Sequence, residues 1–171
     1  MENRLEKKLD KLRKGIRKLD SVLVTFSGGI DSAFLLRICR EELGEKAIAV
    51  TAFSDSYPQD ELSMAKHIAK ALGAKHITIK ENDMVDMIED AEDVNFVLKE
   101  LAATLDLKNV LNAHHMEHTR SKSFLAARRA GLRSPLMEAG LNKAEIRLLA
   151  KYLGLPALDE IGKKKTRKKK R

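Results

Sequence analysis

Five short segments of this chain are predicted to be strands, the first two of them mostly apolar, and the segments between them mostly space their apolar residues as helices do. Runs of about four to eight mostly apolar residues, rich in Val and Ile, are typical of strands buried on both faces of a sheet. Pro135 places the last run at a sheet edge, because Pro cannot donate a ladder hydrogen bond. The predicted strands are 21–26, 47–53, 75–80, 109–113 and 133–136.

The predicted helices begin and end at recognisable residues. Residues 5–19 carry Leu or Ile at alternating spacings of four and three on an otherwise charged segment, which predicts an amphipathic helix. Gly44 and Gly73 each end a later helix, and Asn142 with Glu145 forms a predicted capping box. The predicted helices are 5–20, 32–43, 59–72, two short helices within 83–105 with a break near 93–95, and one that begins at 142 and ends at 152.

Strands that alternate with helices predict an α/β fold with a doubly wound, mainly parallel five-stranded sheet and helices on both faces. In open sheets of this kind the ligand lies beyond the carboxyl ends of the strands, where the strand order reverses. Three segments that follow predicted strands should therefore meet there. These segments are 27–32, 52–57 and 112–120.

Composition indicates one ordinary domain of 171 residues, large enough to bury a core without disulfides. The chain has no apolar run long enough to span a membrane, and its N-terminus is charged. We therefore expect a soluble, cytoplasmic protein. Cys39 is the only cysteine, which excludes an intrachain disulfide and a cysteine-only metal site. Its apolar neighbours predict a packing role for it rather than a nucleophilic one.

The net charge of +8 resides in the tail of the chain. Residues 163–171 hold eight of the 33 basic residues, which leaves 25 basic residues against 25 acidic ones in the remainder. A basic segment of this kind is expected to be disordered and to bind RNA or other phosphate backbones without sequence preference, although it could equally be a solubilising tail. The predicted organisation is an N-terminal amphipathic helix at 1–20, an α/β domain at 21–158 and a basic tail at 159–171, with the helix packed on the domain or on a second copy of the chain.

The sequence Ser-Gly-Gly-Ile-Asp-Ser at 27–32 connects the first predicted strand to the first crossover helix. Adjacent glycines allow a positive φ and a close approach of the backbone to a ligand, and we expect Gly29 to take that positive φ. The serines and the free N–H groups of the helix N-terminus are donors for an anion, so the loop predicts a phosphate site. The alternative is a plain tight turn in which Asp31 or Ser32 caps the helix.

This loop resembles the PP-loop of the N-type ATP pyrophosphatases, and it is neither a Walker loop nor a dinucleotide fingerprint. The resemblance implies a HUP-type, adenine nucleotide alpha hydrolase-like fold that uses ATP and Mg²⁺. Enzymes of that superfamily hold the β- and γ-phosphates of ATP while a nucleophile attacks the α-phosphate, and they release pyrophosphate and form AMP. Residues 21–158 would then be the ATP-binding domain.

A nearer resemblance is carried by four stretches in the same order, namely residues 26–32, Val50-Thr51-Ala52 with Ser56-Tyr57-Pro58, Gly131 to Leu141, and Gly154-Leu155-Pro156. Together they are similar to the LarE-type ATP-dependent sacrificial sulfur transferases over about residues 21 to 158. The resemblance implies that the loop holds the pyrophosphate part of ATP and that the end of the second strand meets the adenosine. The implied nucleotide-binding residues are Ser27, Gly28, Gly29, Ile30, Asp31, Ser32, Ala52, Phe53, Ser54, Asn112 and His114.

Two departures from that family affect the predicted chemistry. Residues 81–105 contain no cysteine and the chain passes into a lysine-rich tail, so sulfur transfer by this chain alone is not expected. The stretch from Asn112 to His118 is closer to the G-H-H-x-D-D pattern of PP-loop tRNA-modifying enzymes, with His118 in place of one acid. The resemblance implies that Asp31 and Glu117 are the catalytic residues and the ligands of Mg²⁺.

His114 and His118 are four residues apart and could lie on one side of a helical turn, as transition-metal ligands do. Neutral histidines also contact substrates or phosphates in nucleotide pockets, and structural histidines are common. All three interpretations remain open from the sequence.

Three functions fit the sequence. The first is an AMP-forming, adenylyl-transferring enzyme acting on an unidentified acceptor, the second is a nucleotide-binding module without turnover or a subunit that needs a partner, and the third is an RNA-modification component that uses the basic tail. The expected partners are ATP and AMP, the acceptor, RNA and a second copy of the chain, with no membrane. Arg120, Lys122, Arg128 and Arg129 are candidate cations for the site because they follow the fourth predicted strand closely.

Overall fold

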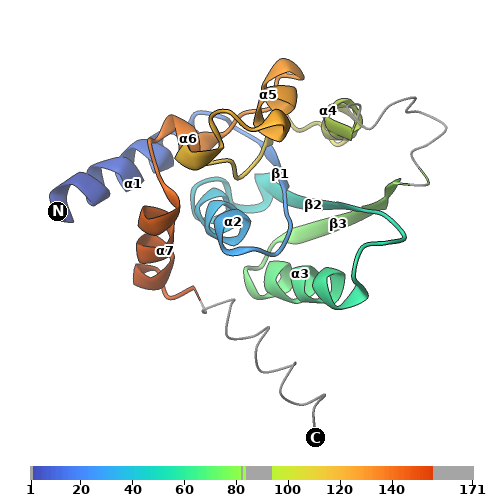
Figure 1. Ribbon diagram of the computed structural model, residues 1–171, viewed down its shortest axis with the longest axis horizontal. Helices are drawn as coiled ribbons and strands as arrows, with labels where there is room; N and C mark the ends of the chain where they lie inside the picture. Colours follow the sequence, from blue (N-terminus) through green and yellow to red (C-terminus); the bar gives the residue numbers. More distant parts are fainter. Residues whose placement is uncertain (1, 82, 84–93, 156–171) are drawn as a thin grey trace, which may run out of the picture.

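The computed structural model describes residues 2–81, 83 and 94–155. They form a parallel four-stranded sheet with helices on both faces (Figure 1). The strands are β1 Val22–Thr25, β2 Ala47–Phe53, β3 Lys75–Lys80 and β4 Asn109–Leu111, the α-helices are α1 Glu2–Arg17, α2 Ile30–Leu43, α3 Gln59–Ala71, α4 Val94–Thr104, α5 Lys122–Arg129, α6 Pro135–Glu138 and α7 Lys143–Tyr152, and the 3₁₀ turns include η1 Gly44–Lys46 and η4 Met116–His118.

The strand order is β3-β2-β1-β4, and every pairing is parallel. The central strand β1 aligns Val22 with Ala47 on one side and with Asn109 on the other. Strands β2 and β3 are therefore added in turn on one side of β1, and β4 pairs with the opposite side of β1. This reversal puts the switch point at the carboxyl ends of β1 and β4, as the sequence predicts.

Two apolar clusters cover the two faces of the sheet. Successive residues of β1 alternate between them, because strand side chains point to opposite faces: Val22 and Val24 belong to one cluster and Leu23 to the other. The first cluster packs the sheet against helices that include α1, α2, α3 and α7, and the second packs it against α4 and α5. The predicted two-sided α/β arrangement is confirmed.

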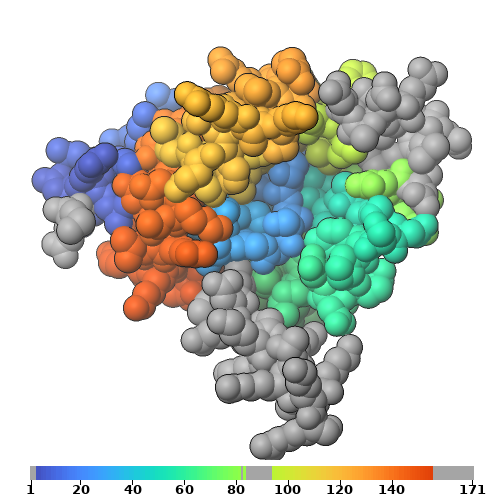
Figure 2. Space-filling view, in the orientation of Figure 1, coloured from blue at the N-terminus to red at the C-terminus, as the bar shows by residue number. Residues whose placement is uncertain are grey.

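The N-terminal helix packs on the body of the same chain, which is the first of the two alternatives given by the sequence. Leu12 and Ile16 are 2% and 0% exposed, and they join the cluster that contains α2 and α7. Ion pairs fix the orientation of the helix, since Arg13 and Arg17 both contact Glu42 of α2. The space-filling view shows α1 continuous with the α6 and α7 region (Figure 2).

The predicted fifth strand is wrong. Pro135 begins the short helix α6, because Pro fits the first position of a helix, where its missing N–H leaves no bond unmade. Only Arg133 pairs with the sheet, through a bridge to Leu111 in which its N–H donates to the carbonyl of Val110. Among the described residues the sheet therefore has four strands, and Arg133 extends it by one residue beyond β4.

Some predictions lie outside the described residues, namely the first of the two short helices within 83–105 and the basic tail at 159–171. The second of those short helices is α4, which begins at Val94, inside the predicted break. Within the parts of the chain that the structure describes, none of the helices is long and apolar enough to cross a membrane.

We expect Ile16→Ala to destabilise the protein by about 2–4 kcal/mol, because it removes a fully buried side chain and leaves a cavity under α1. Lys11→Ala, an exposed position on the same helix, should stay within about 0.5 kcal/mol of the wild type. Urea unfolding followed by circular dichroism measures both. Equal stability of the two variants would show that α1 does not pack on the body in solution.

Candidate functional site

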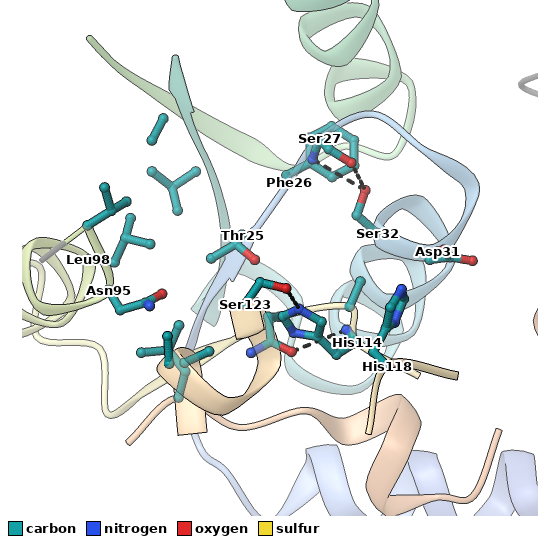
Figure 3. Close-up of a pocket in the computed structure, with 18 of the residues that line it drawn as sticks. Thr25, Phe26, Ser27, Asp31, Ser32, Asn95, Leu98, His114, His118 and Ser123 are labelled. Carbon is teal, nitrogen blue, oxygen red and sulfur yellow. Dashed lines mark hydrogen bonds between the residues drawn. The ribbon is translucent and has the colours of Figure 1, made fainter. Parts of the chain in front are cut away.

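A cavity of about 890 Å³, the main cavity, lies at the carboxyl ends of the strands, and its volume is within the usual range for ligand sites (Figure 3). The three segments expected to meet at the switch point all contribute to its wall, so this prediction is confirmed. The contributing residues are Ser27, Gly29, Ile30, Asp31 and Ser32, then Ala52 and Tyr57, then Asn112, Ala113, His114 and His118. The lining of this main cavity does not include the predicted site residues Gly28, Phe53, Ser54 and Glu117.

Hydrogen bonds within the loop hold it in a compact turn. The hydroxyls of Ser27 and Ser32 lie 3.2 Å apart, and the N–H of Gly29 donates to Ser27 Oγ at 3.3 Å. Ser32 Oγ donates to the carbonyl of Gly29 at 3.1 Å. The two serines therefore stand on the same side of the turn, where their hydroxyls can be offered to a ligand.

The positive φ of the loop is at Gly28, not at Gly29 as expected. Gly28 has φ +82°, and a Cβ added there would lie 3.1 Å from Ala65 Cα of α3. Gly29 has φ −72° and ψ 166°, an extended conformation that any residue adopts. Gly28 is thus required by its backbone angle and by the close approach of α3.

The first turn of α2 is open to an anion. Gly29 is the N-cap residue, so neither Asp31 nor Ser32 caps the helix, and no side chain accepts a capping hydrogen bond there. The first N–H groups of a helix have no intrahelical acceptor, and the helix dipole adds partial positive charge at this end. The helix N-terminus therefore points a set of donors at the main cavity.

Asp31 pairs with a lysine that the sequence analysis missed. Lys143 Nζ donates to Asp31 Oδ2 at 2.6 Å, and His115 Nε2 lies 3.5 Å from the same oxygen. Asp31 Oδ1 is buried and has no hydrogen-bond partner within the described ranges. Oδ2 of this carboxylate thus accepts from the Lys143 ammonium, and Oδ1 is left without a partner among the described residues.

Lys143 is the first residue of α7 and lines the main cavity. The capping box of Asn142 and Glu145, confirmed by the structure, fixes where α7 begins and so where Lys143 stands. The sequence contains this capping signal. It does not indicate that the start of α7 lies beside Asp31, which is 112 residues earlier in the chain.

Glu117 lies behind this ion pair. Its two carboxylate oxygens accept the backbone N–H of Lys143 at 3.2 Å, and His115 Nδ1 donates to Oε2 at 2.5 Å. Desolvation alone would raise the pKa of Glu117, but the hydrogen bonds from Lys143 and His115 outweigh it and lower the pKa. Its observed contacts position Lys143 and His115, and its role as a Mg²⁺ ligand stays a prediction.

Asn112 and His114 bring two further unsatisfied groups to the cavity wall. Asn112 Oδ1 accepts from Ser134 Oγ at 2.6 Å, whereas Asn112 Nδ2 is buried without a partner in the described parts of the chain. His114 Nε2 lies 3.1 Å from Ser123 Oγ, and His114 Nδ1 is also buried and unpartnered there. Four buried side-chain atoms of the described residues lack a partner, and three of them belong to cavity-lining residues, as expected of a site that binds a polar ligand.

The histidine pair His114 and His118 stays a prediction as a metal site. Their rings make an edge-to-face contact with centroids 5.3 Å apart, and His118 Nδ1 accepts the N–H of His115. No group of three or more His, Cys, Asp or Glu side chains could hold a metal ion in the portion of the chain that is described. Burial, with help from the neighbouring histidines, lowers the pKa of both His114 and His118, so both rings favour the neutral form.

Two of the four candidate cations reach the main cavity. Lys122 and Arg129 of α5 line it, whereas Arg120 and Arg128 do not. Cys39 is fully buried in α2, and this burial strongly raises the pKa of its thiol, so it does not provide a thiolate.

Two hydrogen bonds that run across the sheet connect β3 to the residue before the loop. Thr51 Oγ donates to the carbonyl of Phe26, the residue before the loop, at 2.5 Å. Since the Thr51 proton is used there, His76 Nε2 carries the proton in its contact of 2.7 Å with Thr51 Oγ. The edge strand β3 thus helps to position the end of β1.

Comparison with known families and relatives agrees with this geometry. The family model for asparagine synthase matches residues 10–130. An uncharacterized protein of Synechocystis sp. is 32% identical over 168 residues, which is 91% of this chain and 63% of that protein. The pyridinium-3,5-bisthiocarboxylic acid mononucleotide synthase of Lactiplantibacillus plantarum is 31% identical over 156 residues, covering 82% of this chain and 55% of the synthase. An NH₃-dependent NAD⁺ synthetase of Archaeoglobus fulgidus is 26% identical over 153 residues, covering 79% of this chain and 60% of that enzyme.

The chain thus spans 55 to 63% of the length of these curated relatives. Among solved structures, the NH₃-dependent NAD synthetase of Campylobacter jejuni superposes with a TM-score of 0.70 at 21% identity, over 91% of this chain and 74% of that one. The NMN synthetase of Francisella tularensis gives 0.64 at 16% identity, over 89% and 71%. At these identities the structures show a shared fold.

We expect Gly28→Ala to cost about 1–3 kcal/mol of stability, because alanine at a positive φ is strained and its Cβ would press on α3. Gly29→Ala should cost less, since φ is ordinary there and the added Cβ would lie 3.4 Å from Ser27 Oγ. Thermal unfolding of both variants measures the difference. The reverse order would contradict the observed turn.

The folded protein should lose stability below about pH 6.5. Burial, with a smaller effect of Lys66, lowers the pKa of His76, so the unfolded chain binds its proton more readily. The stabilisation is complete above the unfolded pKa and is lost as pH falls through the folded one. Melting curves at about pH 7.5 and 5.5 should show a drop that is smaller in His76→Gln, by roughly 1–3 °C. An identical drop in both proteins would exclude His76 as a contributor.

Proposed function

Because this chain belongs to the asparagine synthase family of PP-loop proteins, we propose that it binds Mg-ATP at residues 27–32 and adenylates an acceptor, with release of pyrophosphate. The observation that carries the proposal is the set of unsatisfied groups around one cavity. The open first turn of α2 and the hydroxyls of Ser27 and Ser32 supply donors, and Asp31 Oδ1 supplies an unpaired acceptor. Together they fit a polyphosphate and its cation.

The phosphates would lie between the loop and the N-terminus of α7. Phosphate oxygens accept from the N–H groups of α2 and from the two serines, while the ammonium of Lys143 neutralises their charge. Lys143 is held in place by Asp31 on its side chain and by Glu117 on its backbone N–H. Preorganised donors of this kind need no rearrangement when charge develops on the leaving pyrophosphate.

The residues present fit a magnesium ion with one protein carboxylate. Mg²⁺ commonly keeps several waters and takes one or two carboxylates plus substrate phosphates, and Asp31 Oδ1 is a buried carboxylate oxygen without a partner in the described residues. Asp31 would hold the ion. When bound, magnesium supplies charge neutralisation at the β- and γ-phosphates.

The adenosine would lie over the ends of β1 and β2, where Val50, Thr51 and Ala52 line the cavity. An acceptor carboxylate then attacks the α-phosphorus: one oxygen–phosphorus bond forms, the bond to the bridging oxygen breaks, and pyrophosphate leaves with the electron pair. An acyl adenylate results, and no proton has to move in this step. The protein's contribution is positioning and charge stabilisation.

The acceptor class is supported by the names of the relatives. One is a synthase of a pyridinium bisthiocarboxylic acid mononucleotide. Another makes NAD⁺ with ammonia. We therefore propose a small carboxylic acid as acceptor, and adenylation as the part of a LarE-like reaction that this chain performs. Sulfur donation by the chain is not proposed, because the fully buried Cys39 is its only cysteine.

A nucleotide-binding module without turnover is the second candidate, favoured by the placement of Glu117 outside the cavity lining. Exchange of labelled pyrophosphate into ATP, with pyridine carboxylates as acceptors, separates the two functions once ATP binding is measured by calorimetry. Exchange supports the enzyme, and binding without exchange supports the module. Absence of ATP binding would overturn both.

Lys143→Gln should weaken ATP binding about 10- to 100-fold, because a charged hydrogen bond to phosphate contributes roughly 1.5–3 kcal/mol. Lys151→Gln is the matched control, since Lys151 is an exposed lysine of the same helix outside the cavity lining. Calorimetric titration with Mg-ATP measures both affinities. Unchanged affinity in Lys143→Gln would show that this lysine pairs with Asp31 only.

A further inference from the structure

A second concave site lies at the edge of the sheet, away from the main cavity. It is a groove of about 480 Å³ between α3 and the edge strand β3, which lie next to each other in Figure 1. Among the described residues, its lining and that of the main cavity have no member in common. We call it the edge groove, and it is lined by Lys66, Lys70, Gly73, Ala74, Lys75, His76 and Thr78.

The charged side chains of the edge groove are all positive. They are Lys66, Lys70 and Lys75, and the described residues add no Asp or Glu to the lining. None of the three lysines lies within ion-pair distance of a carboxylate among residues 2–81, 83 and 94–155. The groove thus carries three positive charges that the described part of the chain leaves unpaired.

Arg40 of α2 adds a fourth cation behind Gly73. A Cβ added at Gly73 would lie 3.7 Å from Arg40 Nη2, so the guanidinium comes close to the wall of the groove. Nη1 of Arg40 donates to the carbonyl of Gly44, whereas its Nε is buried and has no partner within the described ranges. Cations from α2, α3 and β3 therefore surround the edge groove, and they would attract an anion.

The distribution of charge on α3 favours a small anion over a polynucleotide. Lys66 and Lys70 are one helical turn apart, about 6 Å along the axis, so a single phosphate group can contact both. The first turn of the same helix carries Asp60 and Glu61, whose negative charge would repel a phosphate backbone that extended along α3. The positive charge is thus confined to the end of α3 that borders the groove.

His76 connects the edge groove to the main cavity. Its Nε2 donates to Thr51 Oγ at 2.7 Å, and Thr51 Oγ donates to the carbonyl of Phe26 at 2.5 Å. Thr51 and Phe26 both line the main cavity, and Phe26 immediately precedes the loop at 27–32. The rings of Phe26 and His76 also make an edge-to-face contact, with centroids 5.6 Å apart. A change at His76 therefore reaches the residue before the loop through one intervening side chain.

Helix α3 makes a second connection to the loop. A Cβ added at Gly28 would lie 3.1 Å from the Cα of Ala65, and Ala65 is the residue before Lys66. The turn of α3 that carries Lys66 thus packs directly against the loop. A ligand that contacts Lys66 and His76 would contact both elements that hold the loop in position.

One ring nitrogen of His76 is available to a ligand. Nε2 is bonded to Thr51, and Nδ1 forms no hydrogen bond within the described residues. Burial, with a smaller effect of Lys66, lowers the pKa of His76, so the ring favours the neutral form. The other charged groups of the lining, Lys70 and Lys75, are also positive. An anion among these lysines would oppose their effect and favour a proton on Nδ1.

We propose that the edge groove binds a small anion that carries a phosphate group, and that this anion strengthens ATP binding at the loop. Lys66 and Lys70 hold the anion, and His76 Nδ1 takes a proton from solvent and donates it in a hydrogen bond to the anion. The charged ring then donates more strongly to Thr51, whose bond to Phe26 fixes the backbone that enters the loop. The effect on ATP rests on the proposed function, whereas the anion site does not.

The first test measures where phosphate binds. Inorganic phosphate is titrated into the full chain without nucleotide, at an ionic strength held constant with chloride, and NMR follows the ring of His76, which is assigned with His76→Gln. We expect a saturable shift and a rise in the pKa of His76. Lys66→Gln and Lys70→Gln should each weaken phosphate binding roughly three- to tenfold. Lys151→Gln, an exposed lysine of α7 outside both linings, should leave it unchanged.

A His76 ring that does not respond to phosphate, or equal effects of the three lysine variants, would overturn the anion site. Displacement of phosphate from His76 by a short single-stranded RNA at lower concentration would assign the groove to a polynucleotide and overturn the assignment to a small anion.

The second test measures the affinity of the full chain for a non-hydrolysable Mg-ATP analogue by calorimetry, with and without saturating phosphate at equal ionic strength. Because coupling between two sites is reciprocal and commonly fivefold or more, we expect phosphate to tighten binding of the analogue at least about fivefold. His76→Gln should abolish this gain. His67→Gln, an exposed histidine of α3 outside the lining of the groove, should retain it.

An affinity for the analogue that phosphate leaves unchanged or weakens in the wild type would overturn the coupling, and so would a full gain in His76→Gln. Failure of the analogue to bind the wild type would overturn the proposed function and the coupling together. The titration without nucleotide decides the anion site in either case.

Discussion

The ion pair between Asp31 and Lys143 is the contact on which the geometry of the site depends. It joins the first turn of α2 to the first turn of α7, so two helix N-termini converge on one cavity. His115 and Glu117 hold the pair from behind through a hydrogen bond to each other and one to the backbone of Lys143. A cation kept partly buried beside a carboxylate is preorganised for phosphate, because its desolvation has been met during folding.

The parallel sheet explains why these groups can meet at all. β1 pairs with β2 on one side and β4 on the other, so the segments after these strands emerge at one edge of the sheet. Each face of the sheet then adds a different chemistry. The α2 and α7 side supplies the open helix N-terminus and the Asp31–Lys143 pair, whereas α4 and α5 supply apolar side chains together with Lys122 and Arg129. One cavity thus has two walls of different chemical character.

Membership of the asparagine synthase family covers the loop at 27–32 and strands β1 to β4, because the family model matches residues 10–130. The wall that α5 contributes to the cavity depends on side chains that no loop motif specifies.

The sequence alone determined the elements whose signals are local. The loop at 27–32, strands β2 and β3 and the capping box of α7 all follow from neighbouring residues, and the structure has them where the sequence predicts them. Only the tertiary structure decided the rest. Pro135 begins a helix rather than a strand, Gly28 rather than Gly29 takes the positive φ because α3 packs against it, and Lys143 reaches Asp31 across 112 residues. The reason is physical. The spacing of apolar residues and the capping hydrogen bonds depend on residues within one or two helical turns of each other, whereas the direction of a side chain in a site is set by the packing of elements that are distant in the sequence.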